Sequence, residues 1–197
     1  MFGFQSSALL KRALVACAFA SHAAFAAPVT FSGALTATDP VFNRAFTLTT
    51  LSGAGTRVAY DVYGFHVSSA GTYSIEATSF NTNGVGLSSD SFFSLYRGSF
   101  NPASALTNLI QVDDDSGVGS LSLLTSALLA DTQYYLVFSS YSNGQYGSYT
   151  GRFDTVSGGG QVSLDGVGAV PEPATLALLP LALAGMAAAR RRRRQFV

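Results

Sequence analysis

The sequence predicts an all-β fold, a single jelly-roll-like antiparallel β-sandwich over residues 27–157. Short segments rich in aromatic and β-branched residues alternate with clusters of Gly, Asn, Asp and Ser, which is the pattern of strands joined by turns. The alternation is clearest where Tyr73, Ile75 and Ala77 would share one face and polar residues the other. Aromatic residues make up 12% of the chain, which argues against disorder.

Nine segments have the length and alternation of strands. We expect strands at 29–35, 63–67, 71–78, 92–96, 109–112, 121–123, 133–141, 148–154 and 161–164. The segment 133–141 is the most apolar and is therefore expected at the centre of a sheet. A short helical turn is expected near 126–129. Residues 158–169 begin with three glycines and are assigned to a flexible linker, although the last strand falls within them.

Residues 1–26 have the organisation of a secretory signal peptide. A positively charged start is followed by a mostly apolar stretch and a small-x-small triplet, which places cleavage between Ala26 and Ala27. The residues before Cys17 also have the types of a lipoprotein box, which would make Cys17 a lipidated N-terminus. Against that reading, only four residues separate Cys17 from the preceding arginine. Cleavage after Ala26 leaves a mature chain without cysteine.

The end of the chain combines three features in a fixed order. Pro171 and Pro173 hold Glu172 in an extended, exposed conformation. Residues 174–189 carry no charge and are expected to form a transmembrane helix of 16 residues, shorter than the ~20 that comfortably span a bilayer. A cluster of arginines follows, which the positive-inside rule would keep in the cytoplasm: Arg190, Arg191, Arg192, Arg193 and Arg194.

This tail resembles the PEP-CTERM sorting signal of exopolysaccharide-producing Gram-negative bacteria. The resemblance covers residues 170–197. It implies an exosortase-type membrane peptidase as a partner, which would recognise the tail and remove it. The other partners expected are the export translocon, the inner membrane during transit, and exopolysaccharide outside the cell. The expected location is the cell surface or the extracellular matrix, reached through a membrane-anchored precursor.

The charge of the chain lies mainly in its two ends. Residues 27–170 hold four arginines, no lysine and ten acidic residues, a net charge of −6. An acidic domain of this kind is a poor nucleic-acid binder, because phosphate contacts need clustered Lys or Arg. It has one histidine, His66, which alternation places on the solvent side of a strand. We therefore expect no catalytic triad, no zinc site and no enzyme activity.

The sharpest candidate for ligand binding is a run of three aspartates. Asp113, Asp114 and Asp115 precede Ser116-Gly117, and only a loop could bring adjacent carboxylates together. With further oxygens from Asp90 or Asp61, they would form a site for Ca²⁺, which takes six to eight oxygen ligands. The alternative is a turn whose aspartates hydrogen-bond their own backbone. No other cofactor is expected.

A second resemblance covers roughly residues 60–153. The order of the segments is similar to that of the bacterial pre-peptidase C-terminal (PPC) domain, a small β-sandwich found on secreted enzymes and surface proteins: 60–65, 71–73, 93–96, 113–117 and 134–137. Tyr141, Tyr146 and Tyr149 lie among Ser, Asn and Gly and could form an exposed adhesive loop, or an ordinary hairpin around Asn143-Gly144.

These observations favour a non-enzymatic, exported surface or matrix protein that is structural or adhesive in a biofilm. A carbohydrate- or calcium-dependent binding module is the alternative. A hydrolase of matrix polymers ranks third, because nothing in the linear order marks a pair of catalytic carboxylates.

Overall fold

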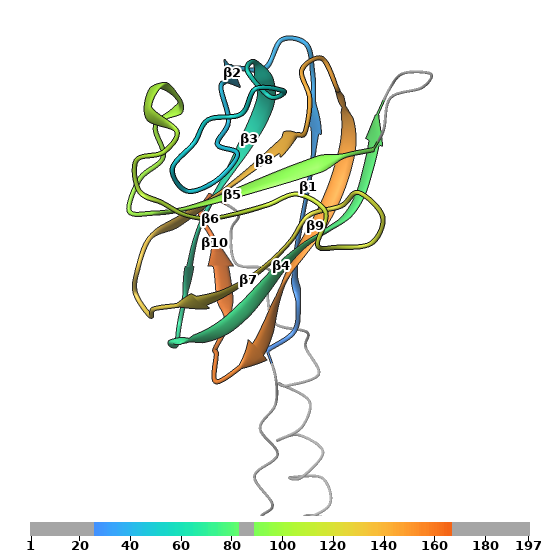
Figure 1. The fold of residues 1–197 in the computed structure, drawn as a ribbon. Coiled ribbons are helices and arrows are strands. Elements are labelled where there is room, and N and C mark those ends of the chain that lie inside the picture. Colours follow the sequence, from blue (N-terminus) through green and yellow to red (C-terminus); the bar gives the residue numbers. More distant parts are fainter. Residues whose placement is uncertain (1–25, 83–88, 167–197) are drawn as a thin grey trace, which may run out of the picture.

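The computed structural model describes residues 26–82 and 89–166, and these form two antiparallel sheets packed face to face (Figure 1). The predicted all-β sandwich is confirmed. The four-stranded sheet has the order β1 (Val29–Leu35), β9 (Gly147–Ser157), β4 (Gly71–Thr82) and β7 (Leu123–Leu128). The other sheet has the order β10 (Val162–Leu164), β3 (Val58–Val67), β8 (Tyr134–Ser140), β5 (Ser91–Arg97) and β6 (Leu109–Asp113), with β2 (Val41–Phe42) beside β3.

The strand pairs are nested in the sequence. Strand β1 pairs with β9, β3 with β8, β4 with β7, and β5 with β6. A long two-stranded antiparallel ribbon that turns back between β5 and β6 would contain all four pairs. When this ribbon is rolled up, successive pairs alternate between the two sheets. This arrangement is the jelly roll. The central position predicted for the segment 133–141 is confirmed, because β8 lies between β3 and β5.

The main core lies between the sheets and is largely aromatic. Alternation along β9 buries every second residue from Gly147 to Phe153, and the predicted common face of Tyr73, Ile75 and Ala77 is buried. The ring of Phe138 stacks on that of Tyr149 with centroids 3.7 Å apart.

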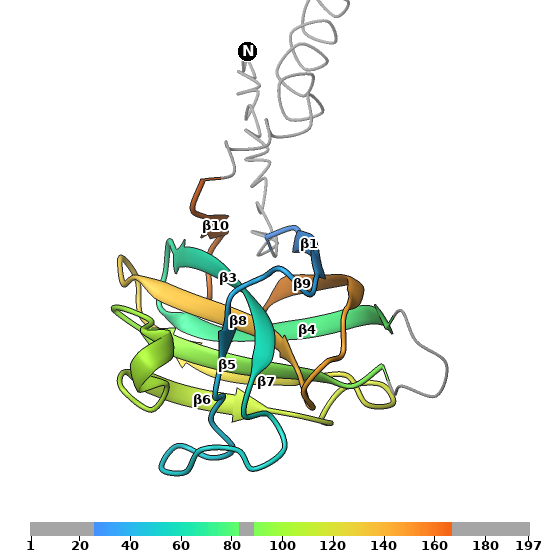
Figure 2. The same ribbon diagram turned by 90° about the horizontal axis from the view of Figure 1, so that it is seen from above.

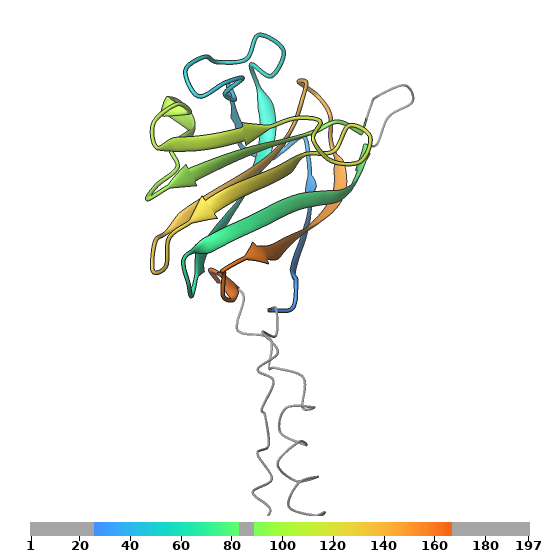
Figure 3. The ribbon, with the colours of Figure 1, turned by 60° about the horizontal axis from the view of Figure 1, so that its bottom comes forward.

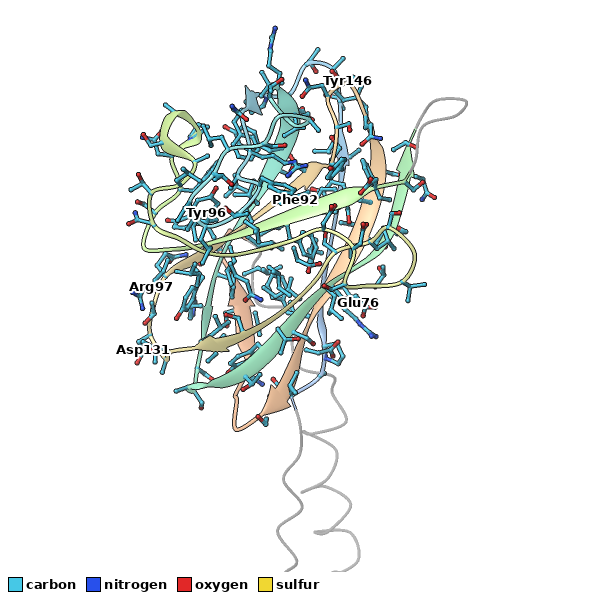
Figure 4. The ribbon with its side chains drawn as sticks, in the orientation of Figure 1. Glu76, Phe92, Tyr96, Arg97, Asp131 and Tyr146 are labelled. Atoms are coloured by element: carbon cyan, nitrogen blue, oxygen red, sulfur yellow. The ribbon has the colours of Figure 1, made fainter. Side chains whose placement is uncertain are left out.

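The outer face of the six-stranded sheet is covered as well. The connection 43–57 and the short 3-10 helix η1 (Pro102–Ser104) lie over it. A second apolar cluster joins side chains of β2, β3, β5 and β8 on this face to Phe100 and Ala105, which flank η1. Figure 4 shows two of the β5 residues on this face, Phe92 and Tyr96. Strand β5 is therefore buried on both faces. The outer face of the four-stranded sheet, by contrast, is exposed and polar.

Side chains bridge both open sides of the sandwich. The Gln111 amide on β6 donates to the Thr125 carbonyl on β7 at 3.2 Å. On the opposite side, the Tyr63 hydroxyl on β3 donates to the Ser32 carbonyl on β1 at 3.1 Å. These bonds use backbone acceptors of edge strands, which would otherwise be available to another chain.

Three local predictions are wrong. Residues 158–164 are not a linker: β10 pairs with β3, and the Gly160 amide donates to the Tyr73 hydroxyl at 2.7 Å. The helical turn near 126–129 is instead the end of β7, where pairing with β4 outweighs the local pattern. The turn at Asn143-Gly144 exists, with Gly144 at a φ of +75°, but it joins β8 to β9 in the other sheet and so makes no hairpin.

The two ends of the described chain lie together. Residue 26, before β1, and residue 166, after β10, are at one end of the sandwich, and the connection 43–57 projects at the other (Figures 2 and 3). Ala26 and Ala27 lie just before β1, and cleavage between them stays a prediction. Within 26–82 and 89–166, no helix has the length and apolarity to cross a membrane. The predicted transmembrane helix 174–189 lies outside the described residues, as do Pro171, Glu172, Pro173 and the arginine cluster.

Candidate functional site: an acidic cluster beside a buried arginine

Three of the four predicted calcium ligands lie together. Asp90 directly precedes β5, and Asp114 and Asp115 directly follow β6. These two strands are neighbours, with Phe93 opposite Asp113, so the two chain segments meet at one end of the sheet. One carboxylate oxygen from each of the three aspartates lies within 4.8 Å of the others, a spacing that could hold a metal ion.

The fourth predicted ligand, Asp113, has a different role. Its Oδ2 accepts hydrogen bonds from the amides of Ser116 at 3.2 Å and Leu123 at 2.7 Å. These bonds close the loop that carries the chain from β6 to β7. The two interpretations of the aspartate run each apply to part of it. Asp113 bonds backbone amides of its own loop, whereas Asp114 and Asp115 lie with Asp90 in the cluster of carboxylates.

The positive charge that acts on the cluster is Arg44, which sequence reasoning did not single out. Its side chain is fully buried, at 0% exposure. The guanidinium donates to the Tyr141 carbonyl from Nε at 3.1 Å and from Nη2 at 2.8 Å, and Nη1 donates to the Ala45 carbonyl at 3.0 Å. It also lies over the ring of Phe92, 3.7 Å from the centroid, and 4.6 Å from that of Tyr141. These are cation–π distances.

The electrostatics of the cluster favour a proton or another cation. Burial, followed by the charges of Asp115 and Asp90, raises the pKa of Asp114 to about 7, although Arg44 acts in the opposite direction. Burial also lowers the pKa of the Arg44 guanidinium, against the attraction of Asp114, Tyr141 and Asp90. One arginine therefore does not neutralise three carboxylates at this point.

Asp114 retains hydrogen-bonding capacity of its own. Its Oδ1 atom is buried and has no hydrogen-bond partner among the described residues. An unsatisfied buried acceptor costs free energy, which a bound cation or water would recover. Carboxylate oxygens, of which the cluster offers one from each of three aspartates, are ligands that Ca²⁺ prefers.

A second polar network bridges the two sheets away from the cluster. The Tyr149 hydroxyl donates to Oδ2 of Asp61 and lies 2.6 Å from the Tyr63 hydroxyl. Burial raises the pKa of Asp61, and the hydrogen bond from Tyr149 opposes this shift. Each of these polar groups is engaged, so the network holds the sheets together.

The predicted adhesive tyrosine loop is wrong. Tyr149 is in the core at 1% exposure, and Tyr141 lies beside the Arg44 guanidinium. Alternation along β9 turns Tyr149 inward, which the loop-like composition around it concealed. His66 does face solvent as predicted; its Nδ1 lies 3.6 Å from the Asp165 carboxylate, and both side chains are about half exposed.

Replacing Asp114 with Asn should stabilise the domain above neutral pH. A carboxyl with a pKa of about 7 in the folded protein and 3.8 in the unfolded protein binds more protons when folded, so its contribution to stability is lost as the pH rises from about 4 to about 7. The Asn variant lacks this titration. We expect it to be more stable than wild type at pH 8 by about 1–2 kcal/mol, allowing for solvent screening.

Urea unfolding in EGTA at pH 4 and pH 8 measures this difference. Asp131→Asn, in an exposed turn outside the cluster, is the matched control and should show no such dependence. An equal free-energy difference between Asp114→Asn and wild type at both pH values would contradict the account of the cluster.

Comparison with known families identifies the tail. Residues 169–194 match the PEP-CTERM protein-sorting motif. No curated protein matches the chain. The matched segment contains the predicted Pro171-Glu172-Pro173 triplet and all five arginines of the cluster. The motif implies processing by exosortase and sorting of the exported protein to the cell surface.

Proposed function

We propose that the mature domain is a non-enzymatic structural or adhesive component of the cell surface or the extracellular matrix, acting in a biofilm. The observation that carries the proposal is the sorting motif at 169–194, joined to a jelly roll that ends only a few residues earlier. The sorting motif directs the protein to the cell surface, and the domain must act at that location. The proposal includes the PPC-like character of the domain.

The surface chemistry of the domain supports this role. Hydroxyl groups line the exposed outer face of the four-stranded sheet: Thr30, Ser32, Thr78, Thr125, Ser148 and Thr150. A shallow depression of about 560 Å³ lies among several of them. Arg152 on this face is held by Glu76 at 2.7 Å and by Asp154 at 3.0 Å (Figure 4 shows Glu76). Such a surface can exchange hydrogen bonds with a hydrated polysaccharide.

Changing Glu172 to Ala should block processing of the tail. The carboxylate between the two prolines is the polar part of the motif, and its loss removes the charged group that we expect a peptidase to recognise. We expect the variant to accumulate as a longer, membrane-held precursor, and wild type to reach the exterior without its tail. Cell fractionation and intact-mass analysis of each form measure the outcome.

Asp165→Asn is the matched control for this experiment, since it removes a carboxylate upstream of the motif. It should be processed like wild type. A wild-type protein that keeps residues 171–197 and stays in the inner membrane would show that the tail is an anchor and would overturn the proposal.

Calcium-dependent binding is the second candidate, favoured by the carboxylate group of Asp90, Asp114 and Asp115. Extracellular modules bind Ca²⁺ at ~0.1–1 mM, and binding to the folded state alone raises the melting temperature. We expect millimolar Ca²⁺ to raise it by several degrees relative to EGTA at pH 8, and by less at pH 5, where Asp114 is protonated.

The matched variants for the melt are Asp115→Asn, which should lose the calcium response, and Asp131→Asn, which should keep it. Mg²⁺ at the same concentration is the control for general ionic effects. No shift with Ca²⁺ in wild type would exclude the metal reading.

A further inference from the structure

Three large apolar side chains are exposed together at one point of the surface. Phe46, Leu48 and Leu51 are 53%, 51% and 48% exposed. They lie within residues 45–51, here called the finger, whose ends are joined by a bridge between Ala45 and Leu51. The other exposed large apolar residues of the described chain are single ones on separate segments: Val41, Val62, Val118, Leu129 and Val156. Single exposed apolar residues are ordinary, whereas a cluster marks a contact surface.

Four backbone amides of the finger are hydrogen-bonded within it. The Phe46 and Thr47 amides donate to the Thr50 carbonyl at 2.8 and 3.2 Å. The Thr47 hydroxyl accepts from the Thr49 amide at 3.2 Å and from the Thr50 amide at 3.1 Å. Its Oγ1 also lies 2.7 Å from that of Thr50. Polar groups of the tip are therefore paired with one another, while the three apolar side chains are about half exposed.

The base of the finger is fixed to the fold. The Ser52 amide donates to the Arg44 carbonyl at 2.9 Å, and the Arg44 amide donates to the Gly55 carbonyl at 3.0 Å. The Ser52 hydroxyl accepts from the Gly55 amide at 2.9 Å. The Arg44 side chain is buried against Phe92 of β5, which fixes the start of the finger. The finger therefore cannot turn its apolar residues back into the core.

The finger is placed to reach away from the rest of the chain. It belongs to the connection 43–57, which projects at the end of the sandwich opposite to residues 26 and 166 (Figures 2 and 3). The tip also carries no charged residue from Ala45 to Ala54.

These features fit a lipid surface better than a protein. Three half-exposed side chains offer on the order of 300 Å², well below the ~800 Å² per partner of a stable protein–protein interface. A bilayer accepts a small apolar tip, provided that the tip is uncharged and its backbone groups are paired internally. We propose that the finger, through Phe46, Leu48 and Leu51, inserts into the interfacial layer of a lipid bilayer. This contact is independent of the sorting tail and goes beyond the proposed surface role.

Sedimentation with phosphatidylcholine vesicles tests the proposal. The sample is the chain without its tail, residues 27–170, which retains both apolar clusters and all ten described strands. The triple variant Phe46→Ser, Leu48→Ser, Leu51→Ser should bind at least about tenfold more weakly than wild type. The matched control changes three exposed apolar residues elsewhere, Val118→Ser, Leu129→Ser and Val156→Ser, and should bind like wild type.

A single tryptophan reports where the finger lies, because the chain contains none. In Leu48→Trp, vesicles should shift the fluorescence emission to shorter wavelength, and lipids brominated near the headgroup should quench it. Val118→Trp, at a site that is 77% exposed in the native chain, should show neither effect. Melting curves of all variants should match wild type, since the altered side chains are exposed.

Several results would overturn the proposal. One is that wild type fails to sediment with vesicles at millimolar lipid, or that the control triple variant loses binding as strongly as the finger variant. Another is self-association of wild type in ultracentrifugation that the finger variant lacks, without vesicle binding, which would make the finger a contact between copies of the chain. Binding that falls steeply with added salt would also contradict insertion of an uncharged tip.

Discussion

A single buried cation holds the outer layer of this domain in place. Moving a guanidinium out of water costs several kcal/mol unless other groups replace its hydration. Three hydrogen bonds from Arg44 to carbonyls, and its cation–π contacts with Phe92 and Tyr141, offset part of this cost. Because the Tyr141 carbonyl lies at the end of β8, 97 residues away, these contacts attach the connection 43–57 to the six-stranded sheet.

The same residue couples two features of the surface. On one side it faces the carboxylates of Asp114 and Asp90, whose repulsion it reduces without removing. On the other side it fixes the base of the finger through its own amide and carbonyl. The acidic cluster and the apolar finger therefore share one support. A change in the charge of the cluster acts on the residue that holds the finger.

The parts of the fold that depend on near neighbours could be predicted from the sequence. Period-two alternation gave the buried face of Tyr73, Ile75 and Ala77, and the apolar composition of 133–141 gave a central strand. The tail could be predicted for a related reason, since a sorting signal is read as a linear order of residues. Of the two further ligands expected from the sequence, Asp90 joins Asp114 and Asp115, because β5 and β6 are neighbours, and Asp61 bonds Tyr149 instead.

The parts that depend on distant contacts could not be predicted. Nothing local to Arg44 shows that its partner is the Tyr141 carbonyl, and a polar connection gives no sign that it covers a sheet. The turn at Asn143-Gly144 was taken for a hairpin because local sequence specifies a turn but not which sheet the next strand joins. Local sequence indicates the strand at 161–164 but not its pairing with β3, which lies about 100 residues away in the sequence and makes residues 158–164 part of the domain.

Amide hydrogen exchange of Arg44→Lys tests the role of this residue most directly. Lysine keeps the charge but lacks the planar fork that bonds the Tyr141 carbonyl twice and stacks on Phe92. We expect the amides of residues 44–55 to exchange at least about tenfold faster than in wild type, with little change in the β8 and β9 amides. Arg97→Lys, at an exposed arginine, is the control. Unchanged protection of residues 44–55 in Arg44→Lys would contradict the account.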